Sequence, residues 1–326
     1  MSRRGATQSV RLCACLVFVT SAVLLGSVAA QAAAANFIHI ATADNITQNY
    51  TNIDNPATNS NPSARLLVTM NLSPNGVPAV VDDHPIGVWY NDSLQKWSIF
   101  NQDMAQMPVG AAFNVRSGGV KSDTPIQTAT TDNIDRHSTV ILNEISNGNT
   151  EAILFSTANW NPDGGKAGIF DNHSTGVLYT GKQWAIYNEC GLSGPSDPVN
   201  SMPVGAAFNT ELHSSVGNNI FVHVAWEYNI PRMPPLNATR YTVIDNPLAN
   251  GNPRALLFIE HNLNPTYPPG QLVSTINPYD SPYIVSPVAV NYLPDVLKWA
   301  IVVTQGQGLG HIPIGAAFNV MVISEP

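Results

Sequence analysis

The sequence predicts an all-β protein built from three tandem, small antiparallel β-sandwich or β-barrel repeats behind an export signal. Three observations support this fold class. One nine-residue phrase occurs three times, as MPVGAAFNV at 107–115, MPVGAAFNT at 202–210 and IPIGAAFNV at 312–320. Between these phrases, short stretches of β-branched and aromatic residues alternate at a period of two. Only 11% of the 326 residues are charged, which is typical of exported β-structure rich in turns.

Residues 1–32 have the pattern of a cleaved signal peptide. Arg3, Arg4 and Arg11 precede the apolar run LCACLVFVTSAVLLGSVAA, which leads into the small residues AQA at 30–32. The alternative is a retained membrane anchor, since the run is nearly long enough to span a bilayer. The alanine-rich end favours cleavage, so we expect an extracellular or cell-surface protein that has no membrane contact after signal removal.

The expected mature chain is acidic and has one cysteine. Cleavage removes Cys13 and Cys15, which leaves Cys190 and excludes an internal disulfide. We interpret Cys190 as a half-buried small apolar residue, and the alternative is a reactive or intermolecular thiol. The whole chain has a formal net charge of −8, and loss of the signal arginines makes it more negative. Such a surface repels phosphate, which argues against nucleic acid and anionic membranes as partners.

The repetition covers whole units, which we place at 33–117, 118–212 and 213–326. FIHIATADNI at 37–46, for example, matches PIQTATTDNI at 125–134 in the second unit. Each unit contains five or six expected strands, enough for a small sandwich with its own core. We therefore expect three independent beads. The alternative is one closed pseudo-threefold body in which the copies share a core.

The repeated phrase is interpreted as a closing strand, because it contains no nucleophile and no proton carrier. Its proline would end a loop, its glycine would allow a bulge or a close backbone approach, and its phenylalanine would fill the core. The asparagine after the phenylalanine can bond a loop backbone. Together with one repeated tryptophan, these positions form a structural signature: Trp97, Trp184, Trp299, Pro108, Gly110, Phe113, Pro203, Gly205, Phe208, Pro313, Gly315 and Phe318.

Aromatic side chains next to the repeated tryptophan are the candidate binding residues. Trp97 and Ile99 share the inward face of one strand, so Phe100 belongs to the other face. Trp89 on the neighbouring strand and Phe100 would form an exposed aromatic shelf, and Tyr187 is the equivalent of Phe100 in the second copy. Flat aromatic rings with nearby amides suit the apolar face of a sugar ring. The competing interpretation is that this face packs against a second sheet or the next repeat.

Acidic turns and histidines give weaker signals. VVDDHP at 80–85 and FDNHS at 170–174 offer oxygen ligands of the kind that Ca²⁺ prefers, but neither matches a known calcium loop and ordinary Asx-turns are favoured. No histidine pair has metal-ligand spacing, so no metal and no other cofactor is expected. Nucleophile-elbow, zinc-protease, phosphate-loop and dinucleotide motifs are all missing from the sequence, and we therefore do not expect an enzyme.

Taken together, the motifs HIAT..NI, IDNP..N.NP.A, GVWYN...KWSIFNQD and MPVGAAFNV resemble a repeat domain of exported bacterial proteins, a family without an established activity. The resemblance covers essentially the whole expected mature chain. It implies secretion and an all-β repeat, and it offers no catalytic residue to carry over. The second copy departs from the pattern, with ILNEISNGNTEA in place of IDNPATNSNPSA.

Export, acidity and repetition favour a non-catalytic protein of the cell surface or the extracellular space. The leading hypothesis is a multivalent binding or adhesion module, because three weak sites gain avidity on a repetitive target such as a polysaccharide or an extracellular matrix. A structural component of an envelope or matrix is the alternative, and a secreted hydrolase is a third.

Overall fold

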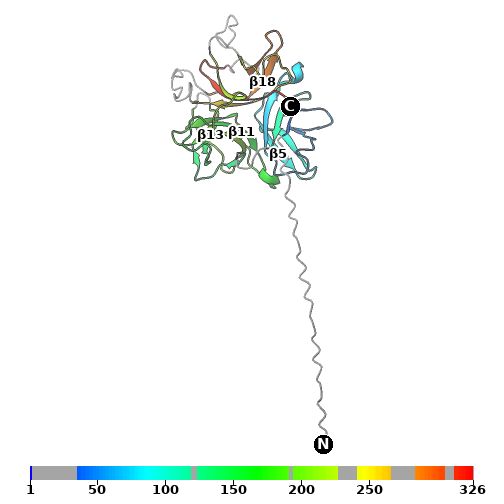
Figure 1. Cartoon of the computed structure of the whole chain (residues 1–326), viewed down its shortest axis with the longest axis vertical. Coiled ribbons are helices and arrows are strands. Elements are labelled where there is room, and N and C mark those ends of the chain that lie inside the picture. The colour runs from blue at the N-terminus through cyan, green and yellow to red at the C-terminus, as the bar shows by residue number, and fades with distance from the viewer. Residues whose placement is uncertain are drawn as a thin grey trace. The chain divides into compact units, whose positions relative to one another are not determined.

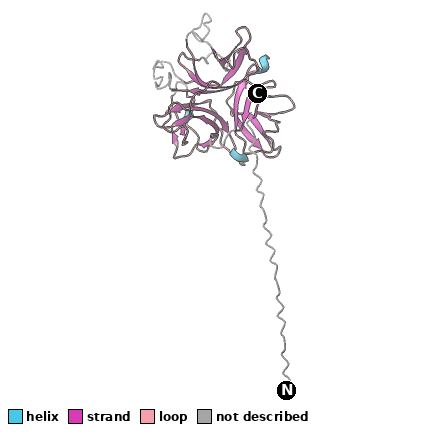
Figure 2. Cartoon of the chain, in the orientation of Figure 1, coloured by secondary structure: helices cyan, strands magenta, loops and turns pink. Residues whose placement is uncertain are grey.

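The structure is a computed structural model that describes Met1 and residues 35–118, 123–190, 194–226, 241–265, 283–304 and 312–325. The predicted signal peptide lies outside the described residues, apart from Met1. No helix within the described ranges is long and apolar enough to cross a membrane. The protein is all-β, and short 3-10 turns such as Pro74–Gly76 and Pro198–Asn200 are its helical segments in those ranges (Figure 2).

The strands recur in the order that the repeats predict. The first repeat contains β1 (Ala35–Ile40), β2 (Ile46–Thr47), β3 (Tyr50–Asn52), β4 (Leu66–Asn71), β5 (Ile86–Asn91), β6 (Lys96–Asn101) and β7 (Ala112–Ser117). The second contains β8 (Ile126–Thr128), β9 (Ile134–Asp135), β10 (Ser138–Val140), β11 (Ile153–Asn159), β12 (Thr175–Tyr179), β13 (Trp184–Asn188) and β14 (Ala207–His213). The third contains β15 (Ile220–Val224), β16 (Tyr241–Val243), β17 (Leu256–Asn262), β18 (Val288–Leu293), β19 (Lys298–Val303) and β20 (Ala317–Ile323).

Each of the three sheets joins strands of two different repeats. The orders are β2-β3-β6-β5-β11-β14-β8, β15-β20-β17-β12-β13-β10-β9 and β1-β7-β4-β18-β19-β16. Pairing within a repeat is antiparallel, whereas the seams between repeats are parallel pairs: β5 with β11, β12 with β17 and β18 with β4. Figure 1 shows the first seam, where β5 and β11 lie side by side. The expected antiparallel pairing within each repeat is confirmed, and the parallel seams between repeats are an addition that the sequence analysis did not predict.

Every repeat has its own core, and a fourth cluster joins all three. The strands of each repeat belong to two different sheets, and the signature tryptophan and phenylalanine are buried between them. In the first repeat these residues are Trp97 and Phe113. The fourth cluster comprises Leu67, Ile153, Phe155, Leu256, Phe258 and Met321. Residues 32–326 accordingly form one compact unit.

The expectation of independent beads is therefore wrong, because the repeats share sheets and a fourth cluster, although each repeat also keeps the core of its own that was expected. The physical reason lies in β4, β11 and β17, whose runs LLV, ILF and LLFI are apolar without strict alternation. A strand of this kind has to be covered on both faces. A separate bead would cover one face and leave the other as an exposed apolar patch.

The repeated phrase fastens one repeat to the next. Asn114, Asn209 and Asn319 are fully buried, and each amide donates to a backbone carbonyl of a different repeat. The three bonds run from Asn114 to Leu257 O (2.9 Å), from Asn209 to Leu66 O (3.0 Å) and from Asn319 to Leu154 O (2.8 Å). The preceding Gly110, Gly205 and Gly315 have φ of +95°, +93° and +93°, a left-handed conformation that favours glycine. The phrase occurs three times because each copy supplies the asparagine that bonds its repeat to another repeat.

Candidate functional site

The outer face of the first seam sheet carries a row of aromatic side chains. Tyr50 on β3 pairs with Phe100 on β6, and Phe100 pairs with Gly87 on β5. Trp89 follows Gly87 by two residues, so it lies on the same face of the sheet. Trp160 directly follows β11, and its backbone N–H donates to Val88 O at 2.9 Å. The seam thus brings residues of two repeats onto one surface.

Five rings form a continuous circuit on this face. Ring centroids are 5.3 Å apart for Tyr50 and Trp89, 6.4 Å for Trp89 and Trp160, 5.8 Å for Trp160 and Phe170, and 5.8 Å for Phe170 and Phe100. Three of these pairs meet edge to face, at 89°, 87° and 84°. Tyr50 and Phe100, the two ends of this series of ring contacts, lie opposite each other in the strand register, and we call the five rings the circuit. In such a contact the edge of one ring meets the face of its neighbour, so successive rings stand at steep angles to one another.

A pocket of about 260 Å³ lies within this circuit. We call it the aromatic pocket, and its lining residues are Gln48, Asn49, Tyr50, Trp89, Phe100, Met104, Trp160 and Phe170. Trp89 is half-buried, while Phe170 and Met104 are exposed at 45% and 60%. Gly87 allows the ring of Phe100 to lie against the neighbouring strand, because a Cβ there would lie only 2.8 Å from that ring.

Two local features of the aromatic pocket are energetically unfavourable. Met104 has a φ of +66°, an unusual conformation for a residue with a side chain, and the amide of Asn49 holds its sulfur at 3.4 Å. The indole N–H of Trp160 is buried and has no hydrogen-bond partner among the described residues. An unsatisfied buried donor costs about 1–3 kcal/mol. Strained or unsatisfied groups concentrate at functional sites.

The aromatic lining is not repeated at the other seams. The strand registers place Leu178 and Asn291 at the position of Trp89, and they place Leu263 and Leu72 at that of Trp160. The described residues therefore present one such pocket and not a row of three similar faces.

The structure brings together two of the three predicted binding residues and separates the third. Trp89 and Phe100 both line the aromatic pocket, whereas Tyr187 does not. Phe100 is only 3% exposed, so the expectation that it forms an exposed shelf with Trp89 is wrong, and Tyr187 at the equivalent position is completely buried. At both positions the competing interpretation, that this face packs against the next repeat, is correct. The physical reason is that strands of the following repeat complete each sheet and its loops cover the outer face.

Tyr187 belongs to a buried polar cluster at the second seam. Its hydroxyl donates to Glu189 Oε1 at 2.9 Å and lies 2.8 Å from His261 Nδ1, while His261 and Glu189 are 2.5 Å apart. The backbone N–H of Ile284 donates to the other carboxylate oxygen of Glu189 at 2.8 Å. Burial, and then the charge of Glu189, raise the pKa of Tyr187 well above its ordinary value. The hydrogen bonds of the cluster connect repeats 2 and 3, so we interpret its buried groups as structural contacts of the second seam.

A smaller pocket of about 100 Å³ lies where the three repeats meet. Three backbone N–H groups beside it each donate to a side chain of another repeat: Val68 to Thr157 (3.0 Å), Ser156 to Glu260 (2.7 Å) and Ile259 to Thr69 (3.3 Å). Among these three acceptor side chains, only Glu260 carries a carboxyl group, and it lines the pocket. Burial raises the pKa of Glu260 to about 8, against the bonds from Ser156, which lower it.

We expect the Glu260→Gln substitution to remove a pH dependence of stability between about pH 4.5 and 8. In this window the folded carboxyl keeps its proton while the unfolded carboxyl has lost it, so the native state binds more protons and the free energy of unfolding falls as pH rises. The wild-type stability minus that of the variant should therefore decrease from pH 5 to pH 8, as measured by urea unfolding at each pH. Parallel curves for the two proteins would contradict the assignment to Glu260.

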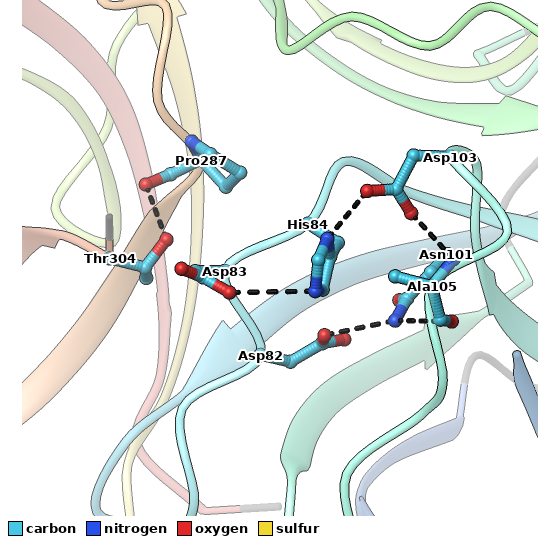
Figure 3. Close-up of polar contacts among 8 residues, drawn as sticks. All are labelled: Asp82, Asp83, His84, Asn101, Asp103, Ala105, Pro287 and Thr304. Carbon is cyan, nitrogen blue, oxygen red and sulfur yellow. Dashed lines mark hydrogen bonds and ion pairs between the residues drawn. The ribbon is translucent and has the colours of Figure 1, made fainter. Parts of the chain in front are cut away.

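The acidic turn at 80–85 forms a separate cluster, drawn in Figure 3. His84 Nδ1 donates to Asp103 Oδ2 at 2.6 Å, and Asn101 donates to Asp82 Oδ1 at 3.0 Å. Burial raises the pKa of Asp82 to about 7, and Asp82 Oδ2 has no donor among the described residues. The second repeat holds an equivalent arrangement, in which Asn188 donates to Asp171 Oδ1 at 3.0 Å. Nowhere in the described ranges are three or more His, Cys, Asp or Glu side chains placed to hold a metal ion.

Cys190 is completely buried rather than half-buried. Burial raises the pKa of its thiol, which lowers its reactivity.

Three aromatic residues of the pocket, Tyr50, Trp160 and Phe170, were not predicted from the sequence. Tyr50 is separated from Trp89 in sequence, and Trp160 and Phe170 come from the second repeat and its loops. One signal was available: Trp160 is a tryptophan where the other copies have leucine.

Comparisons with known proteins agree with the repeat structure. No curated protein matches the chain, and no solved structure matches it. One family model, described as a domain of unknown function (DUF7452), matches three times, at residues 26–117, 93–192 and 196–322. Because these matches cover most of the sequence, the chain belongs to this family of uncharacterised repeat domains.

Proposed function

We propose that the chain is an exported, non-catalytic binding protein that holds a ligand group in the aromatic pocket between repeats 1 and 2. The observation that carries the proposal is the circuit of five rings around an open pocket of about 260 Å³. Concave apolar sites with a few polar groups at the rim are the usual form of small-ligand sites. The predicted signal peptide supports a role at the cell surface or outside the cell.

The lining favours binding over catalysis. The aromatic pocket contains no carboxyl, imidazole, thiol or lysine side chain among its lining residues. A secreted hydrolase would need a nucleophile or a general acid and base within hydrogen-bond reach of its substrate. We therefore propose that the pocket anchors the chain to a group displayed on a polysaccharide or an extracellular matrix. A purely structural role is the competing outcome of the test.

The test compares the mature chain with Trp89→Ala on a glycan array and on insoluble polysaccharide and matrix preparations. We expect retention of the wild type and an affinity at least tenfold lower for the variant, because Trp89 contacts both Tyr50 and Trp160. Leu142→Ala is the control, since Leu142 is 70% exposed and does not line the pocket. Equal retention of Trp89→Ala would show that binding occurs elsewhere. Failure of the wild type to bind any of these materials would favour the structural role.

A further inference from the structure

We infer that the group held in the aromatic pocket is a quaternary ammonium, a cation of the choline type. This inference rests on the proposed binding role of the pocket and names the chemical class of its ligand. It follows from the arrangement of the rings, from the scarcity of hydrogen-bonding groups in the lining, and from the charge of the chain.

The rings enclose a space from several directions. Tyr50, Trp89 and Trp160 meet edge to face in sequence, and Phe170 and Phe100 complete the circuit through a second edge-to-face contact. A flat shelf would present coplanar rings and suit a planar sugar face. The five rings instead stand at 45–89° to their neighbours around the pocket that they line, so a group bound there meets aromatic surface from several sides. Aromatic surroundings of this kind are what proteins use to bind quaternary ammonium groups.

The lining offers few hydrogen bonds. Six of its eight residues are aromatic rings or methionine, and the remaining two are Gln48 and Asn49. The amide of Asn49 already donates to Asn101 O at 3.1 Å and to the sulfur of Met104 at 3.4 Å. A sugar in this pocket would lose water contacts of its hydroxyl groups and meet few side-chain partners to replace them, which is unfavourable. A trimethylammonium group has no N–H or O–H and loses no such bond.

Charge also favours a cation. No Lys, Arg or His side chain lines the aromatic pocket. The whole chain has a formal net charge of −8, so its long-range field attracts cations and repels anions. A neutral apolar group of the same shape would fit the rings equally well but would gain no electrostatic attraction from their faces.

The experiment titrates the mature chain with three probes by calorimetry, with tryptophan fluorescence as a second readout. The probes are choline, its uncharged carbon isostere 3,3-dimethylbutan-1-ol, and methyl β-D-glucoside. We expect choline to bind at least tenfold more tightly than the isostere. We also expect Trp89→Ala to weaken choline binding at least tenfold, and Leu142→Ala to leave it unchanged. Retention of the wild type but not of Trp89→Ala by trimethylammonium-bearing dextran or by phosphatidylcholine vesicles supports the inference and identifies a polymer or a lipid as the source. Equal retention of both proteins by the dextran would reflect ion exchange by an acidic chain and would count against the pocket.

Failure of this inference is distinguishable from failure of the proposed function. Binding of the glucoside in the absence of choline binding would overturn the ammonium assignment and leave the pocket as a sugar site. Equal affinities for choline and its isostere would also overturn it, because the pocket would then recognise shape and apolar surface alone. If no probe binds and Trp89→Ala still matches the wild type on glycan and matrix surfaces, the pocket is not a binding site and both proposals fall.

Discussion

Replacing Phe258 with alanine is expected to lower the free energy of unfolding by about 3–5 kcal/mol, the usual cost of truncating a buried phenylalanine. Phe258 on β17 is 1% exposed and belongs to the central cluster that all three repeats supply. Because this cluster is shared, the loss should destabilise the whole body and not the third repeat alone. Urea unfolding followed by tryptophan fluorescence and by circular dichroism measures the change, since each repeat contains its own buried signature tryptophan.

Leu142→Ala is the matched control for the Phe258 variant, because it also removes an apolar side chain but from a position that is 70% exposed. It should change stability by less than about 0.5 kcal/mol. A Phe258→Ala protein that loses only one third of its fluorescence transition, while the rest unfolds as in the wild type, would contradict a shared core.

Replacing Asn209 with alanine is expected to lower the free energy of unfolding by about 2–4 kcal/mol. The substitution removes the bond from Asn209 to Leu66 O at 3.0 Å and the bond that Asn159 donates to Asn209 at 2.8 Å. The carbonyl of Leu66 and the side-chain amide of Asn159 each lose this hydrogen bond in the protein interior, and each unsatisfied buried group costs about 1–3 kcal/mol. Thermal or urea unfolding of the variant, compared with the wild type, gives the value.

Asn172→Ala provides the comparison for the Asn209 variant, since Asn172 is exposed in the loop before β12. Its stability should match that of the wild type within about 0.5 kcal/mol. An Asn209→Ala protein as stable as Asn172→Ala would mean that the asparagine of the repeated phrase does not fasten the repeats together.

Much of the fold could be predicted from the sequence because local patterns determine it. The period of two placed Trp97 and Ile99 inward and Phe100 outward, and the structure has this alternation. The assembly of the repeats was harder to predict, since a sequence shows which residues are apolar but not which partner covers them. The unbroken apolar runs of β4, β11 and β17 were the available signal that both faces of these strands are buried.

The candidate site could be predicted in part for the same reason. Trp89 and Phe100 lie on neighbouring strands of one hairpin, so the face they share follows from local register. Trp160 and Phe170 join them only through the parallel seam with repeat 2, a long-range pairing that alternation does not encode. Tyr187 was misplaced because Glu189 and His261 satisfy its hydroxyl in the interior, and His261 comes from the next repeat.

The central claim is that the three copies close into one cooperative body and thereby form the aromatic pocket at a seam. Differential scanning calorimetry of residues 32–326, the compact unit, tests this claim most directly. We expect a single unfolding transition whose van 't Hoff enthalpy equals the calorimetric enthalpy, as for a two-state unit. Three separable transitions, or a van 't Hoff enthalpy near one third of the calorimetric value, would mean that the repeats unfold as independent beads and would contradict the account.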